Sequence, residues 1–479
     1  MRFLFFVVAV ALANPINGQN CTCESNFEWV KKTFEENDAG FQYIIDRKGQ
    51  TAYSLHNQLI LERVREAKTL TECAELLREW LRFFRSGHFE IQILTHEQNV
   101  SQTTNEIEKY GVWEVDIPQF AAYIETKQEA DYEGIWDIGG VYKVGIKKEG
   151  ANYIGFIIES NVEGWTEPGQ IKLKIELDKS TFFMRDHSPA VSGTPELIGK
   201  NHLQIGNQML IRLNSIFSDD PLAENYLKSR SSRVPFLDEL NATTLYLRIP
   251  SFDLGSKSAI DQLLADNRDK ILKTENLIID LRNNGGGSDQ SYAELIPFLY
   301  TNPIREISVA ILSSPLNNQL FLELSTATHF FGQEINDDMR QFAKGISDKL
   351  QSSRLGEFVE ISDEPISIIH RDTVYEFPRN VGIIINERNA SATEQFLLAA
   401  KQSRKVKLFG TTTFGALDIS NMNLVESPCN EFMLWYCMSR SLRIPDFAID
   451  DIGLQPDFYL DRTIPQWRWV EFVNDILNQ

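Results

Sequence analysis

A serine stands where an apolar segment gives way to a helical one. The run from Val381 to Ile385 predicts a buried strand, and residues 394–402 predict a helix. Ser391 falls at the turn between them, where its hydroxyl would be exposed at a helix N-terminus and the dipole favours developing negative charge. That position suits a nucleophile. Glu394 follows three residues later, so the pair also fits a capping box in which the serine only caps the helix. From this segment alone, capping is the favoured role.

A second apolar segment runs directly into glycines. Leu277 to Ile279 predicts a strand, and Asp280-Leu-Arg-Asn-Asn leads into Gly285, Gly286 and Gly287. A strand that ends in glycines exposes backbone N–H groups, which can bind an anion or a developing oxyanion. A flexible turn is the alternative interpretation of the same residues.

Together these segments resemble the tail-specific (C-terminal processing) protease family. Its members carry Asp-Leu-Arg-x-Asn-x-Gly-Gly after an apolar strand, then Ser-Ala-Ser-Ala-x-Glu, Gly-x-x-Thr-x-Gly and a late Gly-x-x-Pro-Asp. The chain has four corresponding motifs in the same order, beginning at Asp280, Asn389, Gly410 and Gly453, with asparagine in place of the first serine of the second motif. The resemblance implies an α/β fold with a crotonase-like catalytic core, and proteolysis with Ser391 as the nucleophile.

The resemblance also implies an oxyanion hole. Its donors would be the N–H group of Ala392 and that of one glycine among residues 285–287, with Gly286 preferred. Asn389-Ala-Ser391 has the form of a glycosylation sequon. A glycan beside the nucleophile would block it, so we interpret that match as chance.

The base that most of the family uses is missing. Most members pair the serine with a lysine just after the Thr-x-Gly motif, but that position holds Ala416 here. Lys401 lies ten residues along the predicted helix, about 15 Å from its start. A base must lie within roughly 3 Å of the proton it takes. Lys405 and Lys407 lie further on, so the sequence argues against a lysine mechanism.

A histidine-using branch of the same superfamily, including the tricorn protease core, offers another base. It takes a histidine from an N-terminal segment and a carboxylate from near the C-terminus. Ser86-Gly87-His88 follows a predicted helix, and the matching carboxylate is Asp450, with Asp451 as the alternative. His88 would then accept the proton of Ser391, and the carboxylate would fix the histidine tautomer. An ordinary histidine at the start of a strand is the alternative for His88.

The remaining sequence predicts how the chain is organised. Residues 1–19 have one positive charge and then an apolar run too short to span a bilayer, which needs about 20 residues, so we expect a signal peptide. Residues 20–104 predict a mainly helical segment that ends in the strand of His88. Residues 105–217 predict an antiparallel β-domain, either a sandwich or a small barrel. A linker over 218–240 and a catalytic domain over 241–479 complete the expected order.

Composition limits the partners. The formal net charge is −20 with no stripe of lysine and arginine, which argues against nucleic acid. No cysteine or histidine spacing suggests a zinc site, so we predict no metal and no cofactor. Export would permit disulfides. Cys429 could pair with Cys437, and Cys73 with Cys21 or Cys23, leaving one of the five cysteines over.

The sequence thus predicts an exported serine-type peptidase, periplasmic or extracellular, that cleaves peptides or unfolded proteins through an acyl-enzyme. We expect no stable membrane insertion, and the oligomeric state is left open. Two rivals remain: an inactive peptide- or lipid-binding protein on the same fold, and a serine esterase.

Overall fold

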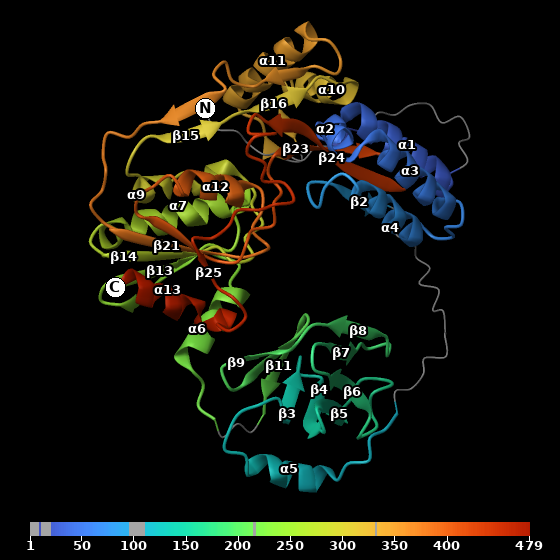
Figure 1. Cartoon of the computed structure of the whole chain (residues 1–479), viewed down its shortest axis with the longest axis vertical. Helices are drawn as coiled ribbons and strands as arrows, with labels where there is room; N and C mark the ends of the chain where they lie inside the picture. The colour runs from blue at the N-terminus through green and yellow to red at the C-terminus, as the bar shows by residue number, and fades with distance from the viewer. Residues whose placement is uncertain (1–8, 11–20, 95–110, 214–216, 331–332) are drawn as a thin grey trace. The chain divides into compact units, whose positions relative to one another are not determined.

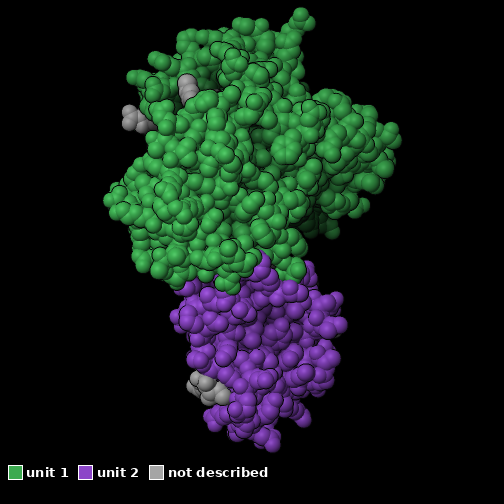
Figure 2. Space-filling view, turned by 60° about the vertical axis from the view of Figure 1, so that its left-hand side comes forward, with its two compact units in different colours: residues 1–98, 233–461, 473–479 green, residues 99–232, 462–472 purple. Residues whose placement is uncertain are grey.

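The computed structural model describes residues 9–10, 21–94, 111–213, 217–330 and 333–479. Strand β1 (Ala9–Val10) is the one described part of the predicted signal peptide. The rest of that segment, and with it the prediction, lies outside the described residues. The chain divides into two compact units (Figure 2). Unit 1 comprises Met1–Gln98, Arg233–Asp461 and Val473–Gln479, and unit 2 comprises Asn99–Ser232 and Arg462–Phe472. The predicted domain limits remain predictions.

The first sheet of unit 1 is almost entirely parallel. Its strand order is β12-β13-β14-β21-β22-β25, and only the β12–β13 pair is antiparallel. The strands predicted from apolar runs before the glycines and before Ser391 are β14 and β21. The strands are β12 (Phe236–Asn241), β13 (Thr244–Arg248), β14 (Asn276–Asp280), β21 (Asn380–Ile385), β22 (Val406–Gly410) and β25 (Phe458–Tyr459).

Helices cover both faces of this sheet, because its strands are apolar on both sides. Helices α7 (Lys257–Asp266), α9 (Ile296–Leu299) and α12 (Ala392–Ala400) lie on one side and α13 (Trp469–Leu477) on the other (Figure 1). On the α13 side, β21 carries Gly382, where a Cβ would come within 2.6 Å of Val473. The arrangement is a mixed α/β fold that delivers the ends of β14 and β21 to one edge.

The second sheet of unit 1 carries the N-terminal helices. Its order is β1-β23-β24-β16-β19, and β2 also pairs with β24. Helices α1 to α4 pack with this sheet and with α10 and α11 around one apolar core. The strands are β2 (Glu90–Ile93), β16 (Val309–Leu312), β19 (Phe358–Glu360), β23 (Ile419–Glu426) and β24 (Phe432–Ser441); the helices are α1 (Cys23–Asn37), α2 (Phe41–Lys48), α3 (Gln50–Val64), α4 (Leu70–Leu81), α10 (Pro315–Leu324) and α11 (Asp337–Ser352).

Short elements complete unit 1. Two small antiparallel pairs, β15–β20 and β17–β18, lie outside the larger sheets. These elements are η1 (Leu254–Ser256), α8 (Arg268–Ile271), η2 (Asp289–Tyr292), β15 (Ile304–Ile307), β17 (His329–Phe330), β18 (Gln333–Glu334) and β20 (Ile366–Ile369).

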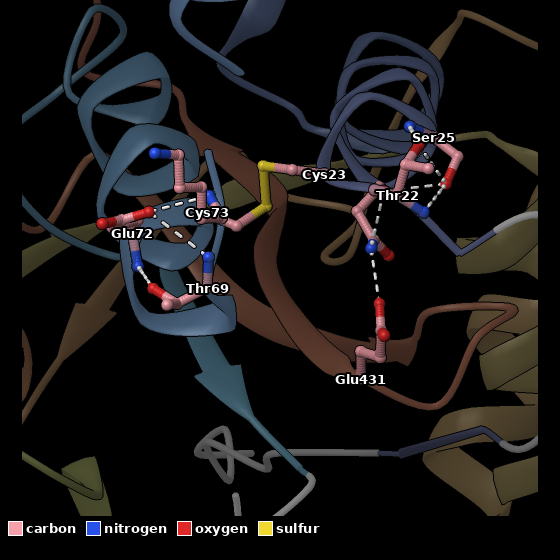
Figure 3. The surroundings of a disulfide bond; sticks show 9 residues. Thr22, Cys23, Ser25, Thr69, Glu72, Cys73 and Glu431 are labelled. Carbon is pink, nitrogen blue, oxygen red and sulfur yellow. Dashed lines mark hydrogen bonds between the residues drawn. A yellow bond between two sulfur atoms is a disulfide. The ribbon is translucent and has the colours of Figure 1, made fainter. Parts of the chain in front are cut away.

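Two disulfides hold the N-terminal segment, one within its helices and one to the rest of unit 1. Cys23 at the start of α1 pairs with Cys73 in α4, beside the capping boxes that begin both helices (Figure 3). Cys21 pairs with Cys429 in the turn between β23 and β24. The expected Cys429–Cys437 bridge is therefore wrong, because β24 carries Cys437 into the core as a free thiol.

Unit 2 contains one nine-stranded antiparallel sheet that curls around its apolar core (Figure 1). Its order is β8-β7-β6-β5-β4-β3-β11-β10-β9. The elements are α5 (Ile117–Glu125), β3 (Gly134–Ile138), β4 (Tyr142–Glu149), β5 (Asn152–Ser160), β6 (Ile171–Ile175), β7 (Ser180–Phe183), β8 (Pro189–Ser192), β9 (Glu196–Ile198), β10 (His202–Ile205), β11 (Gln208–Arg212), α6 (Pro221–Ser231) and η3 (Gln466–Arg468).

The predicted linker, residues 218–240, contains regular structure. Helix α6 (Pro221–Ser231) lies within residues 218–240, and it begins with an Asp220 cap followed by Pro221 at the first helical position. These are ordinary helix-start signals. Ala223 and Tyr226 are buried on this helix, and Leu227 packs beside them. None of the described helices combines the length and the apolar character that a membrane crossing would need.

Candidate active site

Ser391 lies at a strained turn between β21 and α12. Its backbone has φ +57° and ψ −127°, in a region that residues with a side chain rarely occupy. The residue is half-buried, and in the described part of the chain its hydroxyl has no hydrogen-bond partner. The capping-box interpretation is therefore wrong. Strain of this kind clusters at functional sites, and here it presents a free hydroxyl.

Glu394, the second residue of the predicted capping box, binds the segment around Thr413 to Ala416 instead. Its buried carboxylate accepts hydrogen bonds from the Thr413 hydroxyl and from the N–H groups of Gly415 (2.8 Å) and Ala416 (2.9 Å). Burial raises its pKa. The carbonyl of Ala416 in turn accepts the N–H of Ser391 at 2.9 Å. Glu394 thus fixes the segment that supports the serine backbone.

The glycines after β14 lie against the serine turn. A Cβ on Gly286 would come within 2.8 Å of Ser391 Cβ and 2.9 Å of Ala392 N, and its φ is +101°. Only glycine fits here. The N–H of Gly286 donates to Asn284 Oδ1 at 3.0 Å, so in this structure it is not free to bind an oxyanion. Among the described residues, the N–H groups of Gly285, Gly287 and Ala392 have no partner, which leaves the second oxyanion donor open.

Two buried asparagines join the two motifs. Asn284 Oδ1 also accepts the hydroxyl of Thr393 at 2.8 Å, and Asn389 Nδ2 donates to the carbonyl of Asn284 at 3.0 Å. Neither asparagine is a predicted site residue, although both stand inside the motifs. The side chain of Asn389 is fully buried and bonded, which agrees with treating its sequon as chance.

Beneath the glycines lies a buried ion pair. Asp280 accepts hydrogen bonds from Arg282 Nη2 at 2.6 Å and from the Tyr246 hydroxyl at 2.7 Å. Despite burial, the guanidinium groups of Arg282 and Arg248 hold the pKa of the Asp280 carboxyl well below its usual range. The pair gives the Asp-Leu-Arg motif a structural reason, because it anchors the strand end that carries the glycines.

Neither Lys401 nor Lys405 is placed to replace the missing family base. Ala416 is buried at that position, and Lys401 Nζ donates to the carbonyl of Gln455 at 3.1 Å. Lys405 Nζ donates to the carbonyl of Tyr375 at 2.7 Å. Both amines are thus bonded to carbonyl groups.

His88 stands in the turn between α4 and β2, where β2 pairs with β24. Its Nδ1 lies 2.7 Å from the carbonyl oxygen of Ile419. A carbonyl can only accept, so Nδ1 carries the proton and Nε2 carries the lone pair. This is the tautomer that a general base needs.

The His88 turn and Ser391 meet at one residue. A Cβ on Gly87 would come within 3.0 Å of Ala416 Cβ, and Ala416 also accepts the N–H of Ser391. Burial lowers the pKa of His88 to about 4, with a further lowering by the charge of Arg85, against the opposing effect of the bond to Ile419. The imidazole is therefore neutral near pH 7.

Asp450 reaches His88 only through the backbone. Its two oxygens accept the N–H groups of Leu417 (2.6 Å), Asp418 (2.6 Å) and Ile419 (3.0 Å), and neither bonds the imidazole among the described contacts. Burial, and then the charge of Asp418, raise the pKa of Asp450 to about 6. The orienting group on the imidazole is the carbonyl of Ile419, which sequence reasoning missed because no side chain marks it.

Asp451, the alternative carboxylate, holds the other end of the histidine turn. Its Oδ1 accepts the N–H of Ser86 at 2.9 Å. In the described part of the chain, no cluster of histidine, cysteine, aspartate or glutamate side chains could hold a metal ion.

Comparisons with known proteins bear on the family and on the fold. Residues 243–460 match the family model described as "Peptidase family S41". The structure resembles mature CPAF complexed with lactacystin, with a TM-score of 0.50, 12% identity and coverage of 95% of this chain and 97% of that one. Mature CPAF alone gives a TM-score of 0.50, 12% identity and coverage of 95% and 96%. These likenesses show the fold alone. A comparison with curated proteins finds no match.

Proposed function

We propose that the chain is a serine-type peptidase that cleaves peptide bonds through an acyl-enzyme on Ser391, with His88 as the general base. The match of residues 243–460 to the model of peptidase family S41 supports this proposal. The observation that carries the proposal is that two segments meet at Ala416. One is the strained turn of Ser391, whose N–H binds the Ala416 carbonyl, and the other is the turn of His88, whose Gly87 packs against Ala416 and whose Nδ1 is bound to a carbonyl. We also propose the crotonase-like description for the α/β part.

The chemistry follows from these groups. Ser391 Oγ attacks the scissile carbonyl while His88 Nε2 takes its proton, and the N–H of Ala392 together with one glycine N–H stabilises the oxyanion. Collapse breaks the C–N bond, and the imidazolium returns the proton to the leaving amine. Water, deprotonated by the same nitrogen, then releases the acid and restores Ser391.

Apolar side chains near the serine support peptides or unfolded proteins as substrates. Phe414 is 42% exposed, and its N–H binds the carbonyl of Asn389, two residues before Ser391. Ile452 is 55% exposed, and its N lies within 3.0 Å of a Cβ built on Gly415. An unfolded chain offers apolar side chains that such a surface could bind.

We propose that the protein is exported, to the periplasm or the extracellular space. The Cys21–Cys429 and Cys23–Cys73 disulfides support this, because such bridges persist mainly in oxidising compartments. The apolar N-terminal run of the sequence fits the same proposal.

The experiment is hydrolysis of peptide and small ester substrates by the purified protein and by Ser391→Ala and His88→Ala. We expect peptide turnover in the wild type, none in Ser391→Ala, and a loss of about 10³-fold or more in His88→Ala. His329→Ala, which removes an exposed histidine of β17, is the matched control and should keep full activity. Turnover of esters alone would replace the peptidase proposal with an esterase, and no turnover would favour a binding protein.

A further inference from the structure

The turn that carries His88 is held in an unfavourable conformation. His88 has φ +56°, in the left-handed region that side chains disfavour. Such a conformation persists only where the surroundings determine it. The contacts to Ile419 and Asp451 act on the imidazole and on Ser86, so something else must fix the backbone at Gly87 and His88.

Arg85 supplies those contacts. Its Nε donates to the carbonyl of Gly87 at 3.1 Å, and its Nη2 donates to the carbonyl of His88 at 2.9 Å. The same guanidinium forms a two-point bond with Asp38, at 2.8 and 2.6 Å. A planar guanidinium is suited to such a set of contacts, and an ammonium group could not reproduce it.

Asp38 connects this guanidinium to the rest of the fold. It caps the C-terminal end of α1, and its oxygens also accept the N–H groups of Gly40 and Cys437, both at 2.9 Å. The Cys437 thiol itself donates to the carbonyl of His88 at 3.2 Å. The pair therefore joins α1, β24 and the histidine turn at one point.

This ion pair is costly to bury. Arg85 is 4% exposed and Asp38 is 2% exposed. A buried ion pair often contributes no more stability than well-packed apolar side chains of similar volume. Its retention here calls for a role in geometry, and the only atoms the guanidinium contacts besides Asp38 by hydrogen bond, among the described residues, are the two carbonyls of the histidine turn.

We propose that Asp38 and Arg85 are positioning residues that hold the His88 backbone so that Nδ1 meets Ile419 and Nε2 faces Ser391. The inference rests on the proposed function. Arg85 does not touch substrate. It holds the carbonyl groups of Gly87 and His88 in place, and Asp38 holds the guanidinium of Arg85 in place.

Several other charged groups surround this histidine. Asp418 and Asp450 bind each other's backbone segments behind Ile419, and Asp451 binds Ser86. On β2, Glu90 pairs with Arg78 of α4. The positive charge of Arg85 opposes protonation of the imidazole, so its removal should also raise the histidine pKa.

The test compares Arg85→Met and Asp38→Asn with the wild type, alone and in the His88→Ala background. We expect kcat on a peptide substrate to fall by about 10-fold to 100-fold with little change in KM, because a misplaced base affects chemistry more than binding. The acid limb of the pH–rate profile should move to higher pH in Arg85→Met. In His88→Ala, neither substitution should reduce the residual rate further.

Arg212→Met is the matched control for stability. Arg212 of unit 2 is also buried and donates to three carbonyls, those of Lys200, Glu133 and Asp131. We expect it to lower the melting temperature without changing kcat. If Arg85→Met does not fold, Asp38→Asn and rescue of Arg85→Ala by millimolar guanidinium decide the matter. A folded Arg85 or Asp38 variant with full kcat would overturn the proposal. Equal losses of activity in the presence and in the absence of His88 would also overturn it. An inactive wild type would instead overturn the proposed function.

Discussion

Adding a single methyl group at Gly286 should inactivate Ser391 while leaving most of the fold intact. The new Cβ would lie 2.6 Å from the carbonyl oxygen of Ala390, 2.8 Å from Ser391 Cβ and 2.9 Å from Ala392 N. All three separations are well inside the roughly 3.5 Å at which heavy atoms come into contact. The φ of +101° is also unfavourable for alanine.

Relief of these contacts requires the serine turn to move by several tenths of an ångström or more. A displacement approaching 1 Å at a reacting group costs about 10²-fold in rate. We therefore expect Gly286→Ala to lower kcat by about 100-fold and the free energy of unfolding by about 1–3 kcal/mol. The assays are peptide hydrolysis and denaturant unfolding of the same preparations.

Gly356→Ala provides the matched control. Gly356 also has a positive φ, of +89°, but nothing lies within 4 Å of its built Cβ. This variant isolates the backbone cost and should keep its kcat. A Gly286→Ala enzyme that retains kcat within threefold would refute the argument that the glycines and the serine turn share one tightly packed site.

Three further outcomes follow from the structure. The rate at which a fluorophosphonate labels Ser391 should fall in two steps as the pH is lowered. The first step, near pH 6, occurs as Asp450 takes up a proton and releases the backbone of residues 417–419, and the second, near pH 4, as His88 becomes charged. A single step near pH 6.5 would contradict both assignments. Lys172 is fully buried among the rings of Tyr142, Trp165 and Phe182, and burial lowers its pKa to about 7. Its unfolded-state pKa is about 10.4, so the wild type is least stable below pH 7 and gains stability as the pH rises towards 10. After allowance for lost cation–π contacts, Lys172→Met should stabilise by about 2–3 kcal/mol below pH 7, with a gain that shrinks at higher pH in urea unfolding. Replacing Cys23 and Cys73 by serine opens a cross-link between residues 50 positions apart, which should cost about 3–4 kcal/mol in the same assay; an unchanged midpoint would show that the bridge is dispensable.

Sequence patterns predicted the parts of the site that depend on local geometry. The apolar runs before Ser391 and before the glycines specify strands, and the Thr-x-Gly motif specifies the segment that Glu394 binds. Hydrophobic periodicity and turn residues determine structure over short distances, so each of these elements can be predicted from its own segment. For the same reason Asp220 and Pro221 could have revealed α6, had its polar face not concealed the helix.

The rest depends on contacts between distant residues. Cys437 N donates to Asp38, 399 positions away, and no spacing in the sequence predicts that bond. The role of Asp450 is similar. Its position relative to Gly453 marks it as a site residue, but only packing determines whether its oxygens face an imidazole or three backbone N–H groups.

The central claim is that His88 activates Ser391, and the most direct test is labelling with a fluorophosphonate, followed by peptide mapping of the adduct. We predict one phosphonyl group on Ser391 in the wild type, none in Ser391→Ala, and labelling slowed by about 10³-fold in folded His88→Ala. Wild-type labelling rates in His88→Ala would contradict the account, because Ser391 would then be activated by another group.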